Sequence, residues 1–158
     1  MKQLLLWLMV LIVMVMTACQ KIDLIRPDGF AIYQNNDFGY RFVSPDNIMY
    51  RVRAHENKEK ADLTFWKTAL KTHLLDSGYI LLRESEISAK STPGYLLRLS
   101  APAGVKDYDY LVALFAHKEK LVVIESAGES RIFENYRQNI IDTIKNTDIA
   151  IVNLAWLH

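Results

Sequence analysis

The sequence predicts an α+β fold, in which a curved antiparallel sheet is flanked by two main helices as an α/β/α sandwich. Most of the chain consists of short segments that alternate apolar and polar residues, as strands do. Two longer segments, 60–77 and 130–145, carry apolar residues at spacings of three and four, which is typical of amphipathic helices. The strand segments gather in groups around these helices and do not alternate with them. That order favours an antiparallel sheet over a doubly wound parallel one.

The first group of strands is expected between residues 30 and 54. Segments 30–34 and 38–43 flank a turn cluster at 35–37 and predict a hairpin, with Tyr40 and Phe42 on one face. Residues 44–47 include a proline and predict a second turn. The strand 48–54 follows, and two sets of residues alternate along it: Ile48, Tyr50 and Val52 against Met49, Arg51 and Arg53.

The two helices are predicted from their apolar stripes. Gly78 suits the end of the first helix. Its stripe comprises Leu63, Trp66, Leu70 and Leu74. The apolar face of the second helix comprises Ile132, Phe133, Tyr136, Ile140, Ile141 and Ile144.

Four strands are expected between the helices. They cover residues 79–87, 95–99, 108–116 and 121–125, with turns at Ser91–Gly94, Ala101–Gly104 and His117–Lys120. The last two strands should form an antiparallel hairpin in the centre of the sheet. Residues 149–154 close the chain as an extended or packing segment.

Residues 1–20 have the pattern of a bacterial export signal. Lys2 precedes an unbroken apolar run, 4–16, which is shorter than the roughly 20 residues that cross a bilayer core. Small residues at 17–18 directly precede Cys19. The segment 16–19 resembles the lipobox of bacterial lipoproteins, with Met16 where that family usually has leucine. An uncleaved anchor would need a longer span or a more basic flank, and a buried helix would need a polar face.

The lipobox resemblance implies a location. Cleavage would remove the signal peptide 1–18, and Cys19 would become an N-terminus that carries fatty acyl chains such as palmitate. Two or more chains give a stable membrane anchor. Residues 19–29 would form a lipidated tether, followed by a single α+β domain, 30–158, in the periplasm. Gln20 implies the outer membrane, because an aspartate there would resemble an inner-membrane retention signal.

Composition excludes several classes of protein. The 158 residues carry a formal net charge of +1, which disfavours binding to nucleic acid. The single cysteine excludes an intramolecular disulfide framework and any zinc site that needs several thiolates. An aromatic content of 11% argues against intrinsic disorder.

The sequence contains no recognisable catalytic motif, so no catalytic residue, metal or cofactor is predicted. Gly-x-Ser-x-Gly and Gly-x-Gly-x-x-Gly patterns are absent. The segment 55–59 lacks the second histidine of a zinc-protease helix and is interpreted as a polar loop. His73 with Asp76 on a helix, and Glu84 with Glu86 on a strand, could hold a cation. Both pairs are more simply interpreted as ordinary solvated residues.

Tyrosines supply the candidate interaction surface. Tyr95 follows a predicted turn, and Tyr108 and Tyr110 open a predicted strand. Tyrosines at a sheet face or rim make good interface anchors, because they bury a large area at a low entropy cost. The alternative is an ordinary sheet with tyrosines half in its core. Trp156 docks on the domain or at the membrane interface, and the sequence does not decide which.

The order of elements also resembles the Mog1/PsbP-like fold. The aromatic-rich start that ends at Ser44–Asp46 is similar to the opening segment of that group, and so are the predicted turn Ser91–Gly94 and the strand pair that precedes the closing helix. The chain departs from the group where Ile48 and Met49 stand in place of a tryptophan. Members of the group bind proteins without catalysing reactions, and no site residue carries over from the fold.

These observations lead to one expected function and two alternatives. The chain is expected to be a membrane-anchored periplasmic lipoprotein, held by membrane lipid through acylated Cys19, that binds or assembles another protein of the cell envelope. The first alternative is a module that binds a small molecule or a lipid. The second is a divergent hydrolase or metal enzyme. A ligand carrier should have a pocket of roughly 300–1,000 Å³, and an interaction module should expose an apolar or tyrosine patch.

Overall fold

The fold is a single seven-stranded antiparallel sheet with one long helix on each face, as the sequence predicts. The computed structural model describes residues 25–36, 39–103, 106–117 and 119–154. The strands are β1 (Ala31–Asn36), β2 (Gly39–Val43), β3 (Met49–Glu56), β4 (Ile80–Ala89), β5 (Thr92–Ala103), β6 (Lys106–His117) and β7 (Lys120–Glu129). The helices are α2 (Leu63–Asp76), α3 (Ser130–Asn146) and the short α4 (Ile149–Leu154).

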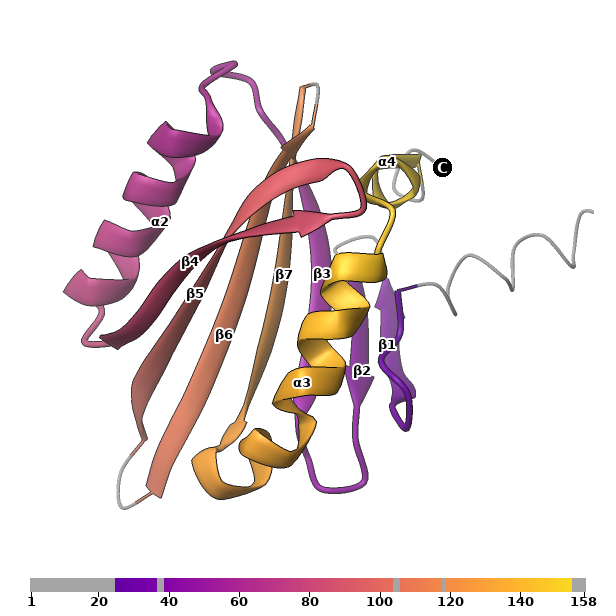
Figure 1. Ribbon diagram of the computed structural model, residues 1–158, viewed down its shortest axis with the longest axis vertical. Helices are drawn as coiled ribbons and strands as arrows, with labels where there is room; N and C mark the ends of the chain where they lie inside the picture. The colour runs from indigo at the N-terminus through magenta and orange to yellow at the C-terminus, as the bar shows by residue number, and fades with distance from the viewer. Residues whose placement is uncertain (1–24, 37–38, 104–105, 118, 155–158) are drawn as a thin grey trace, which may run out of the picture.

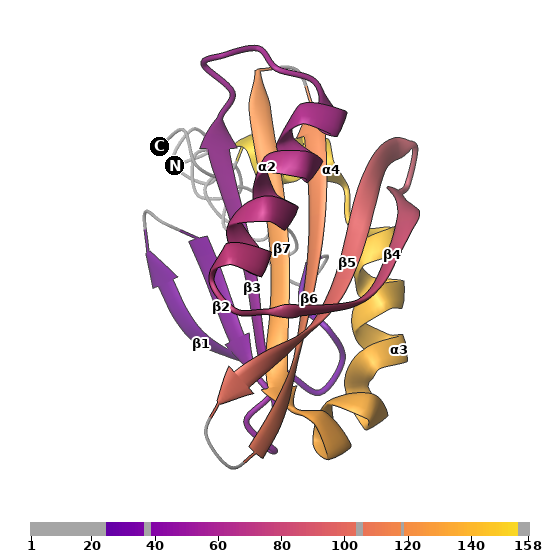
Figure 2. The same cartoon turned by 90° about the vertical axis from the view of Figure 1, so that its left-hand side faces the viewer.

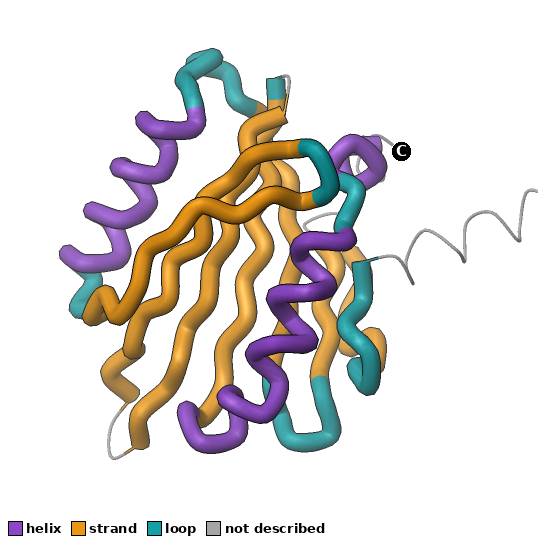
Figure 3. The backbone as a smooth tube through the Cα atoms, viewed as in Figure 1, coloured by secondary structure: helices purple, strands orange, loops and turns teal. Residues whose placement is uncertain are grey.

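The sheet places the predicted hairpin of β6 and β7 at its centre. Its strand order is β1-β2-β3-β7-β6-β5-β4, and all neighbours are antiparallel. Figure 1 shows α3 against one face of the curved sheet, and Figure 2 shows α2 against the other. The tube in Figure 3 makes the single strand layer between the two helices easy to follow.

The main core lies between the sheet and α3. Phe133, Ile140 and Ile144 of α3 are fully buried, as the spacing of that helix predicts. They pack on inward-facing strand residues that include Phe42, Tyr50, Val52, Ala113, Phe115, Val122 and Ile124. Ile25 is also buried in this cluster, so the described end of the expected tether packs against the domain.

A smaller core lies under α2. Of the predicted stripe, Leu74 is buried, and it packs with Leu97, Leu99 and Val112 of the sheet. Leu70 is partly buried against the same cluster, while Phe65 on the same helix is 55% exposed. The helix therefore covers only part of its face of the sheet. Within the described residues, no helix is long and apolar enough to cross a membrane.

Three predicted loops are wrong in position, and one of them is the turn Ala101–Gly104, whose residues Ala101–Ala103 belong to β5. The turn after β4 falls at Lys90 and Ser91, where Lys90 has a left-handed φ of 49°, so the expected turn residues Thr92–Gly94 belong to β5. Gly94 is needed there for a different reason, because an added Cβ would meet the ring of Phe115. The expected polar loop also begins later: His55 and Glu56 continue β3 because they pair with Leu121 and Lys120 of β7.

The final segment is helical, not extended. Ile149 and Val152 are both buried, at a spacing that places them on one helix face. Asp148 starts the helix, since its carboxylate accepts a hydrogen bond from the Ala150 backbone N–H at 3.1 Å. Its backbone carbonyl accepts another from Val152 at 3.3 Å.

Candidate functional site

The three predicted tyrosines share the face of the sheet that carries α2, and all are half-buried. Tyr95 on β5 lies beneath the Lys67 ammonium group of α2, 4.3 Å from the ring centroid. Tyr110 on β6 packs against Tyr79, with the ring centroids 5.3 Å apart. The structure thus gives Tyr95 and Tyr110 different surroundings on this face. Cys19 and Trp156 lie outside the described residues.

Beside α2, the same face carries an open groove of about 280 Å³. No α2 residue lines it, because the helix crosses the other part of the sheet. Arg53 stands beside the groove on β3, two residues beyond Arg51. We term the groove together with Arg53 the arginine face. The residues that line the groove are Arg41, Met49, Arg51, Tyr110, Glu125, Ser126 and Ala127.

Sheet register builds the arginine face. Arg41 of β2 lies directly opposite Arg51 of β3, and Arg51 lies opposite Glu125 of β7. Since directly opposed residues of an antiparallel sheet point to the same side, these side chains gather on one face. Residues two positions apart on a strand also share a face, which adds Arg53.

Glu125 is the one carboxylate among the described lining residues, and both of its oxygens are engaged. Its Oε2 accepts a hydrogen bond from Arg53 Nε at 3.0 Å and lies 2.7 Å from a terminal nitrogen of the same guanidinium. Its Oε1 accepts a hydrogen bond from the Tyr110 hydroxyl at 2.6 Å. Burial, followed by the nearby Glu125 charge, raises the pKa of Tyr110, so this hydroxyl remains a donor.

The Nε atom of Arg51 is buried and has no equivalent partner among the described residues. Burial lowers the pKa of Arg51, and so do the neighbouring charges of Arg53 and Arg41, although Glu125 acts in the opposite direction. A guanidinium remains charged despite such a shift. Arg51 is therefore a positive group whose surroundings favour the approach of an anion.

The sequence contains only part of this site. The alternation along 49–53 separates Arg51 and Arg53 from the apolar residues of that strand, which is the signal for a polar strand face. None of Arg41, Arg51, Arg53 and Glu125 is predicted from the sequence as a site residue, and Arg41 and Glu125 carry no local signal of this kind. Their contribution depends on β2 and β7 flanking β3, and spacing along one strand does not reveal its neighbours.

A second groove, of about 340 Å³, lies between α2 and the sheet and is mostly apolar. The indole of Trp66 donates a hydrogen bond to Asn57 Oδ1 at 3.0 Å, which fixes that ring in the groove wall. Burial lowers the pKa of His55, and the charge of Arg53 acts in the same direction. Its lining is His55, Glu56, Trp66, Ala69, Leu70, His73, Leu114, Leu121 and Val123.

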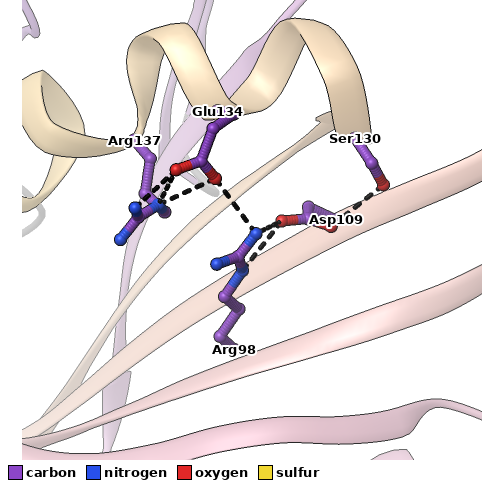
Figure 4. Close-up of polar contacts among 5 residues, drawn as sticks. All are labelled: Arg98, Asp109, Ser130, Glu134 and Arg137. Carbon is purple, nitrogen blue, oxygen red and sulfur yellow. Dashed lines mark hydrogen bonds and ion pairs between the residues drawn. The ribbon is translucent and has the colours of Figure 1, made fainter.

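A polar network ties α3 to the other face of the sheet (Figure 4). The buried carboxylate of Asp109 accepts a hydrogen bond from Arg98 Nε at 2.8 Å and another from the Ser130 hydroxyl at 2.9 Å. Arg98 also contacts Glu134 of α3 at 3.2 Å, and Arg137 pairs with the same carboxylate. Because every charged member has an opposite partner, the network fits a structural role.

The candidate metal ligands do not converge. Among the described residues, no group of three His, Cys, Asp or Glu side chains is placed to hold a metal ion. Glu84 instead pairs with two lysines of α2, Lys67 and Lys71, each at 2.7 Å. These contacts fasten α2 to β4.

Comparison with known proteins identifies the fold. No family model and no curated protein matches the sequence. A Pseudomonas aeruginosa protein of unknown function, described as a putative regulator, aligns with a TM-score of 0.59 at 6% identity, over 76% of this chain and 96% of that one. Cyanobacterial PsbP from Synechocystis aligns with a TM-score of 0.54 at 14% identity, over 75% and 80% of the two chains. The domain therefore has a PsbP-like α+β fold.

Proposed function

We propose that this chain is a membrane-anchored periplasmic lipoprotein that acts as a non-catalytic protein-interaction module of the cell envelope. The lipobox resemblance around Cys19 supports the anchor and points to the outer membrane. Two or more acyl chains on this residue would hold the domain stably at the bilayer surface. The domain would then meet its partner as a tethered module.

The observation that carries the interaction role is the open arginine face. The apolar side chains of Met49 and Ala127 are only half-buried on this face. The surface is mixed, with apolar side chains beside guanidinium groups. Arginine and tyrosine are enriched at protein interfaces, and they often dominate the binding energy.

A second candidate function rests on the groove under α2. Its volume of about 340 Å³ reaches the lower end of the range for small-ligand sites. Leu114, Leu121 and Val123 would contact the apolar part of a ligand. This candidate predicts that lipid or another apolar molecule co-purifies with the protein and is detected by mass spectrometry after extraction.

Site-directed photocrosslinking in bacterial cells tests the proposed function. The photoreactive residue p-benzoylphenylalanine replaces Met49 on the arginine face or, as a control, the exposed Asn135 on α3. We expect one dominant envelope protein to be crosslinked from position 49 and not from position 135. The crosslink should disappear when Cys19→Ala abolishes the anchor. Equal yields from both positions, or no protein adduct from position 49, contradict the proposed function.

A further inference from the structure

We propose that the arginine face binds an acidic segment of the partner protein, with an Asp or Glu carboxylate of that segment seated on Arg51. This inference rests on the proposed function and names the chemistry of the partner. It commits to a protein segment because the groove combines a cationic group with apolar walls.

The Nε atom of Arg51 leaves hydrogen-bonding capacity unused. This buried atom has no partner among the described residues. A buried donor without a partner is costly, whereas a guanidinium paired with a carboxylate forms short, charge-assisted hydrogen bonds. Glu125 does not supply this pair, because its oxygens already accept hydrogen bonds from Arg53 and Tyr110. Because Nε itself is closed to solvent, a carboxylate from outside the chain would pair with the terminal nitrogens of the Arg51 guanidinium, since Arg51 lines the open groove.

Positive side chains lie close together on this face. Opposed Cα atoms in an antiparallel sheet lie about 5 Å apart, which applies to Arg41 and Arg51. Residues two apart on one strand lie about 7 Å apart, which applies to Arg51 and Arg53. Glu125 already pairs with Arg53, so a carboxylate that enters the groove meets mainly the charge of Arg51, with Arg41 on the adjacent strand. Such a field favours anions and steers their approach.

The wall of the groove combines apolar side chains with the Arg51 guanidinium. Met49, Ala127 and the Tyr110 ring line the same groove as Arg51. A volume of about 280 Å³ exceeds what one carboxylate fills, so apolar atoms of the ligand would cover these side chains. An acidic residue next to an apolar residue in a protein segment has this mixed character. A free inorganic anion would leave the apolar walls uncovered.

The chain contains a template for the proposed contact. Glu125 shows that a carboxylate fits this face when an arginine and the Tyr110 hydroxyl donate to it. Arg51 lies directly opposite Glu125 in the register. A partner carboxylate above Arg51 would repeat that arrangement from the solvent side.

The experiment combines the position 49 photocrosslink with Arg51 variants of the full-length protein. Arg51→Gln removes the charge, and Arg83→Gln is the matched control on the opposite face, where Arg83 lines a different groove. Circular dichroism and a thermal melt establish that both variants are folded. We expect Arg51→Gln to lower the crosslink yield by about tenfold, and Arg83→Gln to leave it unchanged. Mass spectrometry should place an Asp or Glu within a few residues of the crosslinked site on the partner.

A charge swap completes the test. Arg51→Glu should abolish the crosslink, and replacing the partner's acidic residue by arginine should restore it. A yield that is unchanged in folded Arg51→Gln, or a crosslinked partner segment without an acidic residue, overturns the acidic-segment proposal but leaves the interaction function standing. Crosslinking to lipid alone, or from position 135 alone, overturns both.

Discussion

Replacing Arg51 with methionine should not destabilise the protein, whereas the same change at Arg53 should. A buried hydrogen-bond donor without a partner costs about 1–3 kcal/mol, and the Arg51 Nε atom is such a donor. Repulsion from the positive charges of Arg53 and Arg41 adds to that cost. Methionine keeps most of the apolar stem of the side chain. We therefore expect Arg51→Met to raise the free energy of unfolding by about 1 kcal/mol.

The opposite sign is expected at Arg53. Its guanidinium binds Glu125 at 2.7 Å, and the two side chains are only 26% and 16% exposed. Removing the arginine leaves a partly buried carboxylate that, among the residues that the structure describes, keeps the Tyr110 hydroxyl as its donor. Hydrogen bonds to charged groups contribute about 1.5–3 kcal/mol. We expect Arg53→Met to lower the free energy of unfolding by an amount near the lower end of that range.

Urea unfolding at pH 7, followed by circular dichroism, measures both changes. If the m-values are unchanged, the difference in urea midpoint between each variant and the wild type reports the change in stability alone. Added salt should reduce the benefit of Arg51→Met, because screening weakens the repulsion among the arginines. If Arg51→Met destabilises the protein as much as Arg53→Met does, Arg51 is a structural residue and the reasoning about its missing partner is wrong.

Three further predictions follow. The hydrogen bonds from Lys67 and then Lys71 lower the pKa of Glu84. The stability that Glu84 contributes is therefore present above its ordinary pKa of 4.5, and it is lost as the pH falls through the folded-state pKa. Glu84→Gln should lower the melting temperature at pH 7, and the difference from wild type should vanish in acid. Gly94→Ala should destabilise the protein by about 1–3 kcal/mol in urea, because the new Cβ would lie 2.7 Å from the backbone oxygen of Leu114 and against the Phe115 ring. Cys19→Ala should abolish incorporation of labelled palmitate, and normal labelling of that variant would refute the lipid anchor.

The elements of this fold were predictable because each one carries a local pattern. Alternation along 48–54 places Tyr50 and Val52 in the core, and the spacing of Phe133, Ile140 and Ile144 defines the buried face of α3. The turn between β4 and β5 was less predictable. The proline and glycine in Ser91–Gly94 are typical turn residues, so composition favours a turn at the wrong position. The structure uses Gly94 for close packing and places the turn at Lys90 and Ser91.

The candidate site was much less predictable than the fold. Tyr110 was identified from its residue type, and the structure places it in the groove, where its hydroxyl binds Glu125. The meeting of Arg41, Arg51 and Glu125 requires β2, β3 and β7 to be neighbours, although β3 and β7 are far apart in the sequence. That pairing is fixed by the packing of the whole sheet and leaves no mark in the local sequence.

The two faces of the sheet are stabilised in different ways, and the difference bears on function. On the α3 face, Arg98 binds Asp109 and Glu134. On the arginine face, Arg53 has Glu125, but the buried Nε of its neighbour Arg51 has no partner among the described residues. Folding alone gives no reason for that arrangement, since an apolar residue at position 51 would avoid its cost. Because functional surfaces commonly reduce stability, a destabilising Arg51 would fit the role in partner binding that we propose for this groove.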